Sequence, residues 1–419
     1  MPTLLQLPNE ILALVAQELN HPSLLSFRFC SKLANSATLA IFSKRSFTTR
    51  YVMLSQYSLD SLLQIARHPT LRLAVKDVCI CIDHLLEFPE IDSTTRYCLE
   101  LDEYETSSRY VFVNQPAYQS LLQDQRMLMT GGWCTAYLAQ ILSLLPALES
   151  VHIENSHRPW GARTIQQRVG IWPNNVMERD DSKSFVREVL SATLSAITAS
   201  QNTVERLCIS AGWDDMAVNS NILVFSQPSG LYISESLQQI RSLDVTLSPE
   251  MNLLVNFHWV DDLCGFVSSF LGLEELNLEF SPRLRRGQLR HLQGRLKLEN
   301  LHTLRLDCVD TDSEELINFL SGFADTIRHL GLSCVEILGT AQDWRLVVHK
   351  LHELVPLKSL MLDTCLTERH EVYMPEETEH GVDYLSRFSV TGSHDEVASQ
   401  INKLMLAQIR DDVFIPFDE

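Results

Sequence analysis

Residues 357–365 read Leu-Lys-Ser-Leu-Met-Leu-Asp-Thr-Cys, and this short stretch sets the pattern for most of the 419-residue chain. Its aliphatic residues are Leu357, Leu360 and Leu362, so two residues separate the first pair and one residue separates the second. Because successive side chains of a strand point to opposite faces, Leu360 and Leu362 would share one face. The spacing therefore predicts a short strand with one apolar face, and Cys365 stands where the backbone would turn out of that strand.

The same triplet recurs along the chain from Val75 onward. The other copies are Val75/Val78/Ile80, Leu148/Val151/Ile153, Val204/Leu207/Ile209, Ile240/Leu243/Val245, Leu273/Leu276/Leu278, Leu301/Leu304/Leu306, Ile327/Leu330/Leu332 and Leu385/Phe388/Val390. Triplets of this kind also arise by chance in a chain rich in aliphatic residues, so their spacing is the stronger evidence. From Val204 onward, successive triplets begin 26 to 36 residues apart.

Amphipathic segments with helical spacing lie between the triplets. One carries Leu316, Phe319 and Leu320 behind a capping pair, Asp312 and Glu315. Strands that alternate with helices at a regular period favour a right-handed solenoid with a parallel sheet. Ser393-His394-Asp395-Glu396 is a capping box, so residues 393–419 are expected to form a closing helix and an acidic tail.

The triplet resembles the Leu-x-x-Leu-x-Leu core of leucine-rich repeats, in which Asn or Cys follows at the place of Cys365. Most other units depart from that pattern, with Val309 and Val335 at the same place. The resemblance implies an irregular α/β leucine-rich-repeat-like solenoid over residues 75–392, with insertions near 87–133 and 155–181. An ordinary α/β domain is the alternative.

The N-terminal stretch predicts a small helical module. Leu-Pro-Asn-Glu-Ile-Leu at residues 7–12 suits a helix start, because Pro lacks an N–H and an acidic residue favours the positive end of the helix dipole. Asn-His-Pro at 20–22 ends that helix, residues 23–30 form a second and residues 34–42 a third. Three helices in so few residues bury little surface, so some of their large apolar side chains are expected to contact a partner.

These motifs resemble the F-box of fungal proteins, over roughly residues 4–82. The similarity rests on the Leu-Pro-x-Glu-Ile-Leu start, on Leu-Leu-x-Phe-Arg-x-Cys-x-Lys at 24–32 and on the segment at 58–69. The sequence departs from many F-boxes because Leu33 and Ala34 stand where a Trp is common. The resemblance implies an F-box at 4–45, a bridging segment at 46–74, and contacts to a Skp-type adaptor by Leu7, Pro8, Ile11, Val15, Leu19, Leu24, Leu25, Phe27 and Phe29.

What the family does implies the function we expect for this chain. It would be a substrate-recognition subunit of a cullin–RING (SCF-type) ubiquitin ligase that binds a target protein through its repeat region. Long loops on a rigid scaffold often bind partners, and exposed Trp and Arg are frequent hot spots. Trp160, Arg163, Arg168 and Trp172 in the second insertion are therefore our candidate target contacts, although both Trp side chains could instead pack against the solenoid.

Composition argues against several other classes of protein. The formal net charge is −19 with no cluster of Lys and Arg, so nucleic-acid binding is not expected. No run of about 18 apolar residues suggests a membrane span, and the first residues lack a basic segment typical of a secretory signal. We read the ten cysteines as reduced thiols of a cytoplasmic and/or nuclear protein.

The sequence shows no motif for catalysis. It contains no Gly-rich phosphate loop, no Gly-x-Ser-x-Gly and no His-Glu-x-x-His, so neither an enzymatic activity nor a cofactor is expected. His349 and His352 lie three residues apart on a predicted helix, where a solvated face is favoured over a metal site. Two alternatives remain open: an adaptor-binding protein without a role in ubiquitination, and an enzyme of unrelated fold.

Overall fold

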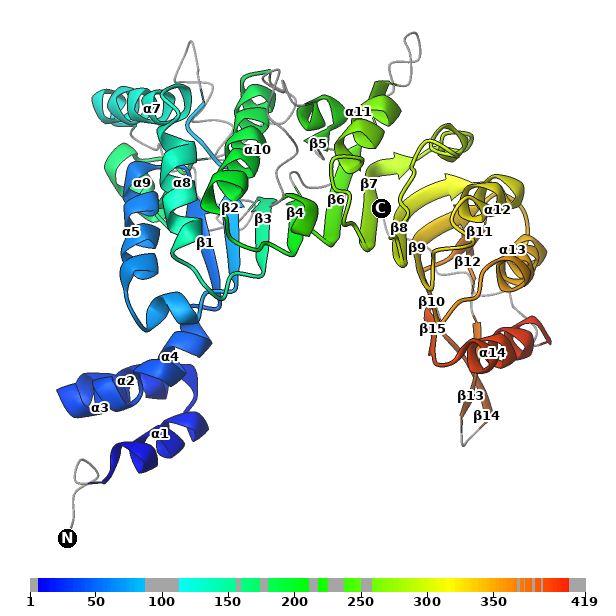
Figure 1. Ribbon diagram of the computed structural model, residues 1–419, viewed down its shortest axis with the longest axis horizontal. Helices are drawn as coiled ribbons and strands as arrows, with labels where there is room; N and C mark the ends of the chain where they lie inside the picture. Colours follow the sequence, from blue (N-terminus) through cyan, green and yellow to red (C-terminus); the bar gives the residue numbers. More distant parts are fainter. Residues whose placement is uncertain are drawn as a thin grey trace. The chain divides into compact units, whose positions relative to one another are not determined.

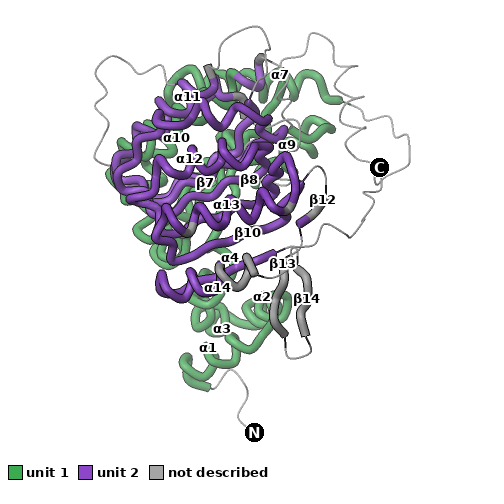
Figure 2. Tube along the Cα trace, turned by 90° about the vertical axis from the view of Figure 1, so that its right-hand side faces the viewer, with its two compact units in different colours: residues 1–176, 184–204 green, residues 177–183, 205–419 purple. Residues whose placement is uncertain are grey.

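The computed structural model describes residues 7–86, 113–155, 160–173, 180–210, 218–224, 237–249, 258–367, 370–372, 374–378, 381–385 and 387–406. Two compact units make up the chain (Figure 2). Unit 1 contains Met1–Val176 and Ser184–Val204, and unit 2 contains Met177–Lys183 and Glu205–Glu419.

Unit 1 begins with four short helices, drawn in dark blue in Figure 1: α1 (Asn9–Glu18), α2 (His21–Cys30), α3 (Lys32–Ala37) and α4 (Leu39–Ser46). Local capping explains where two of them start, because the Asn20 side chain accepts from the Ser23 N–H and the Ser31 side chain from the Ala34 N–H, both at 3.0 Å. The predicted third helix is divided at Thr38, whose backbone adopts φ −101° and ψ 1°.

Three parallel strands form the sheet of unit 1: β1 (Thr49–Met53), β2 (Asp77–Cys81) and β3 (Ser150–Glu154). Val52 pairs with Ile80 and Ile80 with Ile153, so the apolar positions of the three strands are in register. The first strand lies inside residues 46–74, the segment expected to bridge the two domains, so the sheet begins at Thr49 rather than near Val75.

Helices connect the strands of unit 1. A 12-residue helix, α5 (Gln56–Arg67), and a short turn, η2 (Leu71–Leu73), lead from β1 to β2. The first predicted insertion is described from residue 113 onward and contains α7 (Gln115–Thr130), which is followed by α8 (Trp133–Ser143). The second predicted insertion contains α9 (Ala162–Val169), and α10 (Asp180–Ser200) begins at its end.

Six longer strands pair in parallel in the described part of unit 2 (Figure 1), and the apolar triplets of these strands stand in register. The strands are β4 (Arg206–Ser210), β6 (Ser242–Ser248), β7 (Glu275–Leu284), β8 (Thr303–Thr311), β9 (His329–Ile337) and β10 (Ser359–Asp363). In register across the sheet stand Leu207, Leu243, Leu276, Leu304, Leu330 and Leu360. Each of these leucines is at most 3% exposed, and burying one contributes roughly 1.5–3 kcal/mol.

The helices of unit 2 place their apolar faces in the same core. They are α11 (His258–Val267), α12 (Ser313–Ser321) and α13 (Ala341–Leu354), and they contribute the buried side chains Phe266, Phe319 and Trp344. Shorter elements are β5 (Val218–Asn219), η4 (Ser220–Leu223), η5 (Leu237–Gln239) and η6 (Leu289–His291). Helices followed by a parallel α/β sheet confirm the predicted fold class.

The last triplet departs from the predicted parallel arrangement. Phe388 and Val390 lie in β15 (Arg387–Thr391), which pairs antiparallel with β10. In the sequence, the connection from β10 to β15 contains β11 (Leu366–Thr367), β12 (His370–Glu371) and the hairpin of β13 (Met374–Thr378) and β14 (Gly381–Leu385). A parallel return needs a crossover, usually a helix, and the described residues of this connection contain none.

The closing helix has the capping box that the sequence predicts. In α14 (His394–Leu406), the Ser393 N–H donates to the Glu396 carboxylate at 2.7 Å, and the Glu396 N–H donates to the Ser393 hydroxyl at 3.4 Å. The predicted acidic tail beyond Leu406 lies outside the described residues. Across the described part of the chain, no helix is both long and apolar enough to span a membrane.

Candidate functional site

The first helix has one apolar face inside the fold and another in solvent. Leu12 and Ala16 are fully buried, whereas Ile11 is 41% exposed and Leu14 is 56% exposed. Ile11 and Leu14 are three residues apart and therefore lie close together on the outer face. The turn before them is fixed by the Pro8 carbonyl, which accepts from the N–H groups of Ile11 and Leu12 at 3.0 and 3.1 Å.

The second and third helices repeat this division. Leu24 is fully buried and Phe27 is 9% exposed, and Phe27 packs in a small core with Leu12 and Ala34. Phe29 is 88% exposed and Leu33 is 42% exposed. Leaving large apolar side chains in water forgoes their burial energy, so exposed ones clustered in a small module mark an interaction surface.

The structure divides the predicted adaptor contacts into three groups. Pro8, Ile11 and Phe29 are exposed, and Leu7, Val15, Leu19 and Leu25 are partly exposed. Leu24 and Phe27 are core residues of the fold described, and their role as adaptor contacts stays a prediction. Sequence reasoning also missed Leu14 and Leu33. The spacing of Leu14 from Ile11 was the available signal, because it continues the helical stripe outward.

Two arginines connect α4 to the two preceding helices α1 and α2. The Arg45 guanidinium donates to the backbone carbonyls of Gln17 and Leu19 at the end of α1. The Arg28 guanidinium lies 3.9 Å from the centre of the Phe42 ring, and its partial burial lowers its pKa. These contacts fix α4 against α1 and α2, so the exposed apolar residues are presented on a rigid module.

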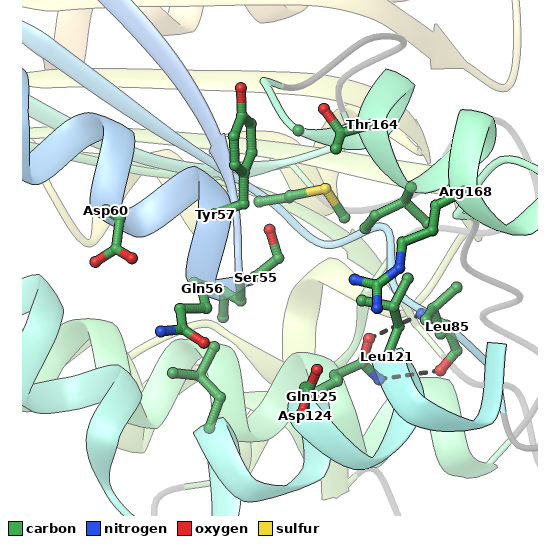
Figure 3. A pocket seen from close by; sticks show the side chains of 15 residues that line it. Ser55, Gln56, Tyr57, Asp60, Leu85, Leu121, Asp124, Gln125, Thr164 and Arg168 are labelled. Carbon is green, nitrogen blue, oxygen red and sulfur yellow. Dashed lines mark hydrogen bonds between the residues drawn. The ribbon is translucent and has the colours of Figure 1, made fainter. Parts of the chain in front are cut away.

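A second feature of unit 1 is a cavity of about 330 Å³ (Figure 3). It lies between the start of α5, the helix α7 and the helix α9, with Tyr57, Asp60, Asp124, Thr164 and Arg168 among its lining residues. In Figure 3, dashed lines join Gln125 to the backbone of Leu85, with lengths of 2.9 and 3.0 Å. The lining is mixed, because apolar side chains such as Leu54, Leu121 and Ile165 stand beside the charged groups of Asp60, Asp124 and Arg168.

The four predicted target contacts are all exposed, and one of them reaches the cavity. Trp160 and Trp172 are 38% and 39% exposed, and Arg163 and Arg168 both lie on the outer side of α9. Of the four, Arg168 lines the cavity. Trp160 is held against the sheet of unit 1. Its backbone N–H donates to the Tyr51 carbonyl at 3.3 Å, and the centre of its ring lies 5.3 Å from the Arg50 guanidinium.

One histidine of the predicted pair on α13, His349, has a polar partner. His349 Nε2 lies 3.3 Å from a carboxylate oxygen of Glu353, which also pairs with Lys350 at 2.7 Å. All three side chains are between 44% and 49% exposed. The side chain of His352 is not among those that the structure describes. For His349, the structure shows a contact with Glu353.

Comparison with known proteins bears on the N-terminal helices. Residues 4–40 match the F-box domain. No curated protein matches the chain. Among solved structures, a chain from the crystal structure of the Rad7 and Elc1 complex in yeast is similar at 13% identity, over 83% of this chain and 86% of that chain, with a TM-score of 0.26. A similarity with so low a TM-score supports no inference about this chain. The family match, by contrast, shows that residues 4–40 of this chain are an F-box domain.

Proposed function

We propose that this chain is the substrate-recognition subunit of a cullin–RING (SCF-type) ubiquitin ligase, acting in the cytoplasm or nucleus. Its F-box would hold a Skp-type adaptor, and the α/β units would hold a target protein. The observation that carries the proposal is the F-box domain at residues 4–40 together with the large apolar side chains that this domain leaves exposed.

The size of the exposed surface fits a docking role. The exposed fractions of Ile11, Leu14, Phe29 and Leu33 amount to a little more than two whole side chains. Burying that much apolar surface contributes roughly 3–7 kcal/mol before the costs of association. A few such anchors can dominate an interface, so these side chains would supply a large share of the affinity for the adaptor.

The chain would act by proximity, without an active site of its own. A target bound to unit 1 or unit 2 would be held near the ubiquitin-conjugating enzyme recruited by the RING subunit, which raises the effective concentration of its lysines. For the target we propose the exposed residues Trp160, Arg163, Arg168 and Trp172. Arg168 lines the cavity, which supports its role in binding. Trp160 and Trp172, which precede and follow it in the sequence, are both partly exposed.

Reconstitution of the ligase tests this function. The full chain would be combined with a Skp-type adaptor, a cullin, a RING subunit and the ubiquitin-transfer enzymes, and ubiquitin transfer to proteins bound by the chain would be measured. The variant Leu14→Asp/Phe29→Asp should abolish recruitment of the cullin. The matched control Leu73→Asp/Leu271→Asp changes side chains that are 58% and 62% exposed outside the F-box, and it should leave recruitment unchanged.

The outcomes separate the possible functions. Recruitment of the cullin with transfer of ubiquitin to a bound protein supports the proposal. Recruitment of the adaptor without the cullin or without transfer would favour an adaptor-binding protein that has no role in ubiquitination. Equal recruitment by the wild type and by Leu14→Asp/Phe29→Asp would overturn the assignment of the docking surface.

A further inference from the structure

Two cysteines occupy the same place in neighbouring strands of unit 2. Cys308 in β8 and Cys334 in β9 each lie two residues after the last leucine of a triplet, and they are 26 residues apart, like the triplets themselves. On either side of them the strands pair in parallel, Asp307 with Ser333 and Val309 with Val335. The two thiols therefore occupy equivalent positions on adjacent strands.

The backbone at both cysteines is left-handed, with φ 58° at Cys308 and φ 48° at Cys334. Leu306 and Val309 are both buried in the core, although regular alternation would point residues three apart to opposite faces. The left-handed residue breaks the alternation, so Asp307 and Cys308 both lie away from that core. Thr364 has φ 48° at the same place in the next repeat, which shows that the turn belongs to the repeat and not to cysteine.

This turn brings three metal-ligating groups together. One carboxylate oxygen of Asp307 and the sulfur atoms of Cys308 and Cys334 lie within 4.8 Å of one another. Ligand atoms of a tetrahedral zinc ion, with bonds of about 2.0–2.3 Å, lie about 3.3–3.8 Å apart. The cluster therefore needs only a small contraction around an ion, and all three residues are partly accessible to solvent, which gives an ion a path in.

The Asp307 carboxylate accepts a hydrogen bond from the Cys308 thiol, but one of its two oxygens is left unsatisfied. Asp307 Oδ1 is buried and has no hydrogen-bond partner in the described part of the chain, and the same holds for Arg283 Nη2. A buried oxygen without a donor is costly, and a cation would satisfy it. Arg283 also pairs with Asp310 at 2.6 Å and lies close enough to affect both thiols, so it offsets part of the negative charge of two thiolates and a carboxylate.

The thiols are unsuited to act as free nucleophiles. Burial and the neighbouring Asp307 raise the pKa of Cys308 to about 12, and burial also raises the pKa of Cys334. Both shifts disfavour the thiolate, which is the nucleophilic form of cysteine. A bound cation inverts this preference, because it replaces the protons of the thiols that it coordinates.

A second group, Cys79, His152 and Glu154 in unit 1, has comparable spacing but a different chemistry. His152 Nε2 already contacts the Ser150 hydroxyl at 2.8 Å, and Cys79 is 3% exposed. This group has one sulfur where the cluster in unit 2 has two. The thiol pair and the unsatisfied carboxylate oxygen favour the cluster in unit 2.

We propose that Asp307, Cys308 and Cys334 bind one thiophilic divalent cation, zinc in the cell, with solvent as the remaining ligand. The ion joins β8 to β9 where both strands turn, and so fastens two successive repeats together. This site is independent of the proposed ligase function, because no residue of the F-box takes part in it.

Cobalt binding to the full chain under reducing conditions tests the proposal. Co²⁺ reports its ligands through visible ligand-field bands and a thiolate-to-metal charge-transfer band in the near ultraviolet. The wild type should take up one Co²⁺ per chain with both signals, and Zn²⁺ should displace it. A wild type that shows no charge-transfer band at saturating Co²⁺ would overturn the proposal, whatever the variants do.

Variants locate the ion. Cys308→Ser and Cys334→Ser should each lose the charge-transfer intensity of one thiolate and weaken binding at least tenfold, and Asp307→Asn should weaken binding with the charge-transfer band retained. Cys264→Ser is the matched control, because Cys264 is a partly buried cysteine of unit 2 outside the cluster, and it should bind like the wild type. Loss of the signal in His152→Ala with retention in Cys308→Ser would place the ion in unit 1 and contradict the assignment.

Discussion

Phe29→Ala is the most informative single change in the F-box, because the side chain is large and 88% exposed. Fully burying a Phe side chain contributes roughly 1.5–3 kcal/mol, and nearly all of that surface is available to a partner. We expect truncation to cost about 2 kcal/mol of adaptor binding, which corresponds to roughly a 30-fold higher Kd. The free energy of unfolding should change by no more than about 0.5 kcal/mol, because the side chain contributes little to the core.

Phe27→Ala provides the contrast within the same helix. Phe27 is 9% exposed and packs against Leu12 and Ala34, so its truncation should destabilise the F-box by about 3–5 kcal/mol. Adaptor binding would then be lost together with the helical structure of this module. The two phenylalanines, two residues apart, thus separate a surface effect from a folding effect.

Calorimetric titration of the purified full chain with a Skp-type adaptor measures the Kd, and thermal unfolding followed by circular dichroism measures the stability of the chain. Phe29→Ala should raise the Kd and leave the unfolding curve unchanged. An unchanged Kd in a complex that still forms would show that Phe29 lies outside the interface. A lower melting temperature that accounts for the lost binding would show a structural role instead.

Three further changes test the fold. Trp344→Ala should destabilise unit 2 by about 3–5 kcal/mol in denaturant titrations, because the indole is fully buried and donates to a backbone carbonyl at 3.0 Å. Asp312→Ala should cost about 1 kcal/mol by removing the cap of α12, and Asp312→Asn should restore most of it. Hydrogen bonds from Ser393 lower the pKa of Glu396, so its contribution to α14 is present above the pKa of unfolded glutamate and lost as pH falls through the lower folded value. The protection factors of the α14 amides, which are corrected for the intrinsic exchange rate at each pH, should therefore fall in acid, and Glu396→Gln should remove that pH dependence.

The apolar triplets were sufficient to predict most of the sheet. In a parallel ladder the inward positions of successive strands stand side by side, so a repeated spacing in the sequence becomes a stack in the structure. Leu276, Leu304 and Leu330 show this directly, because they pair in register across β7, β8 and β9. The capping residues Asp312 and Ser393 likewise fixed helix starts locally, which explains why these starts were predictable.

Features that depend on long-range packing were not predicted. Strand β1 lacks the triplet, and it is recognised by its pairing with β2, 28 residues further along the chain. The direction of β15 depends on the connection that precedes it, and its own triplet is compatible with either direction. The cluster at Cys308 and Cys334 depends on a left-handed turn that the sequence of a degenerate repeat does not specify.

The structure shows which of the predicted adaptor contacts are exposed, and their contact with an adaptor stays a prediction. A resemblance identifies apolar positions of a family but does not separate those that face a partner from those that face the core. In α2 the same pattern contains Phe27, which is buried, and Phe29, which is almost fully exposed. Helical spacing from a known inward residue resolves this, since Leu14 lies two residues after the buried Leu12 and falls on the opposite side of α1.

Hydrogen exchange of the full chain with and without a Skp-type adaptor tests the central claim most directly. We expect new protection in α1 to α3, around Leu14 and Phe29, at saturating adaptor, with exchange in the strands of unit 2 unchanged. Protection confined to unit 2, or no protection at any adaptor concentration, would contradict the claim that residues 4–40 are an adaptor-docking element.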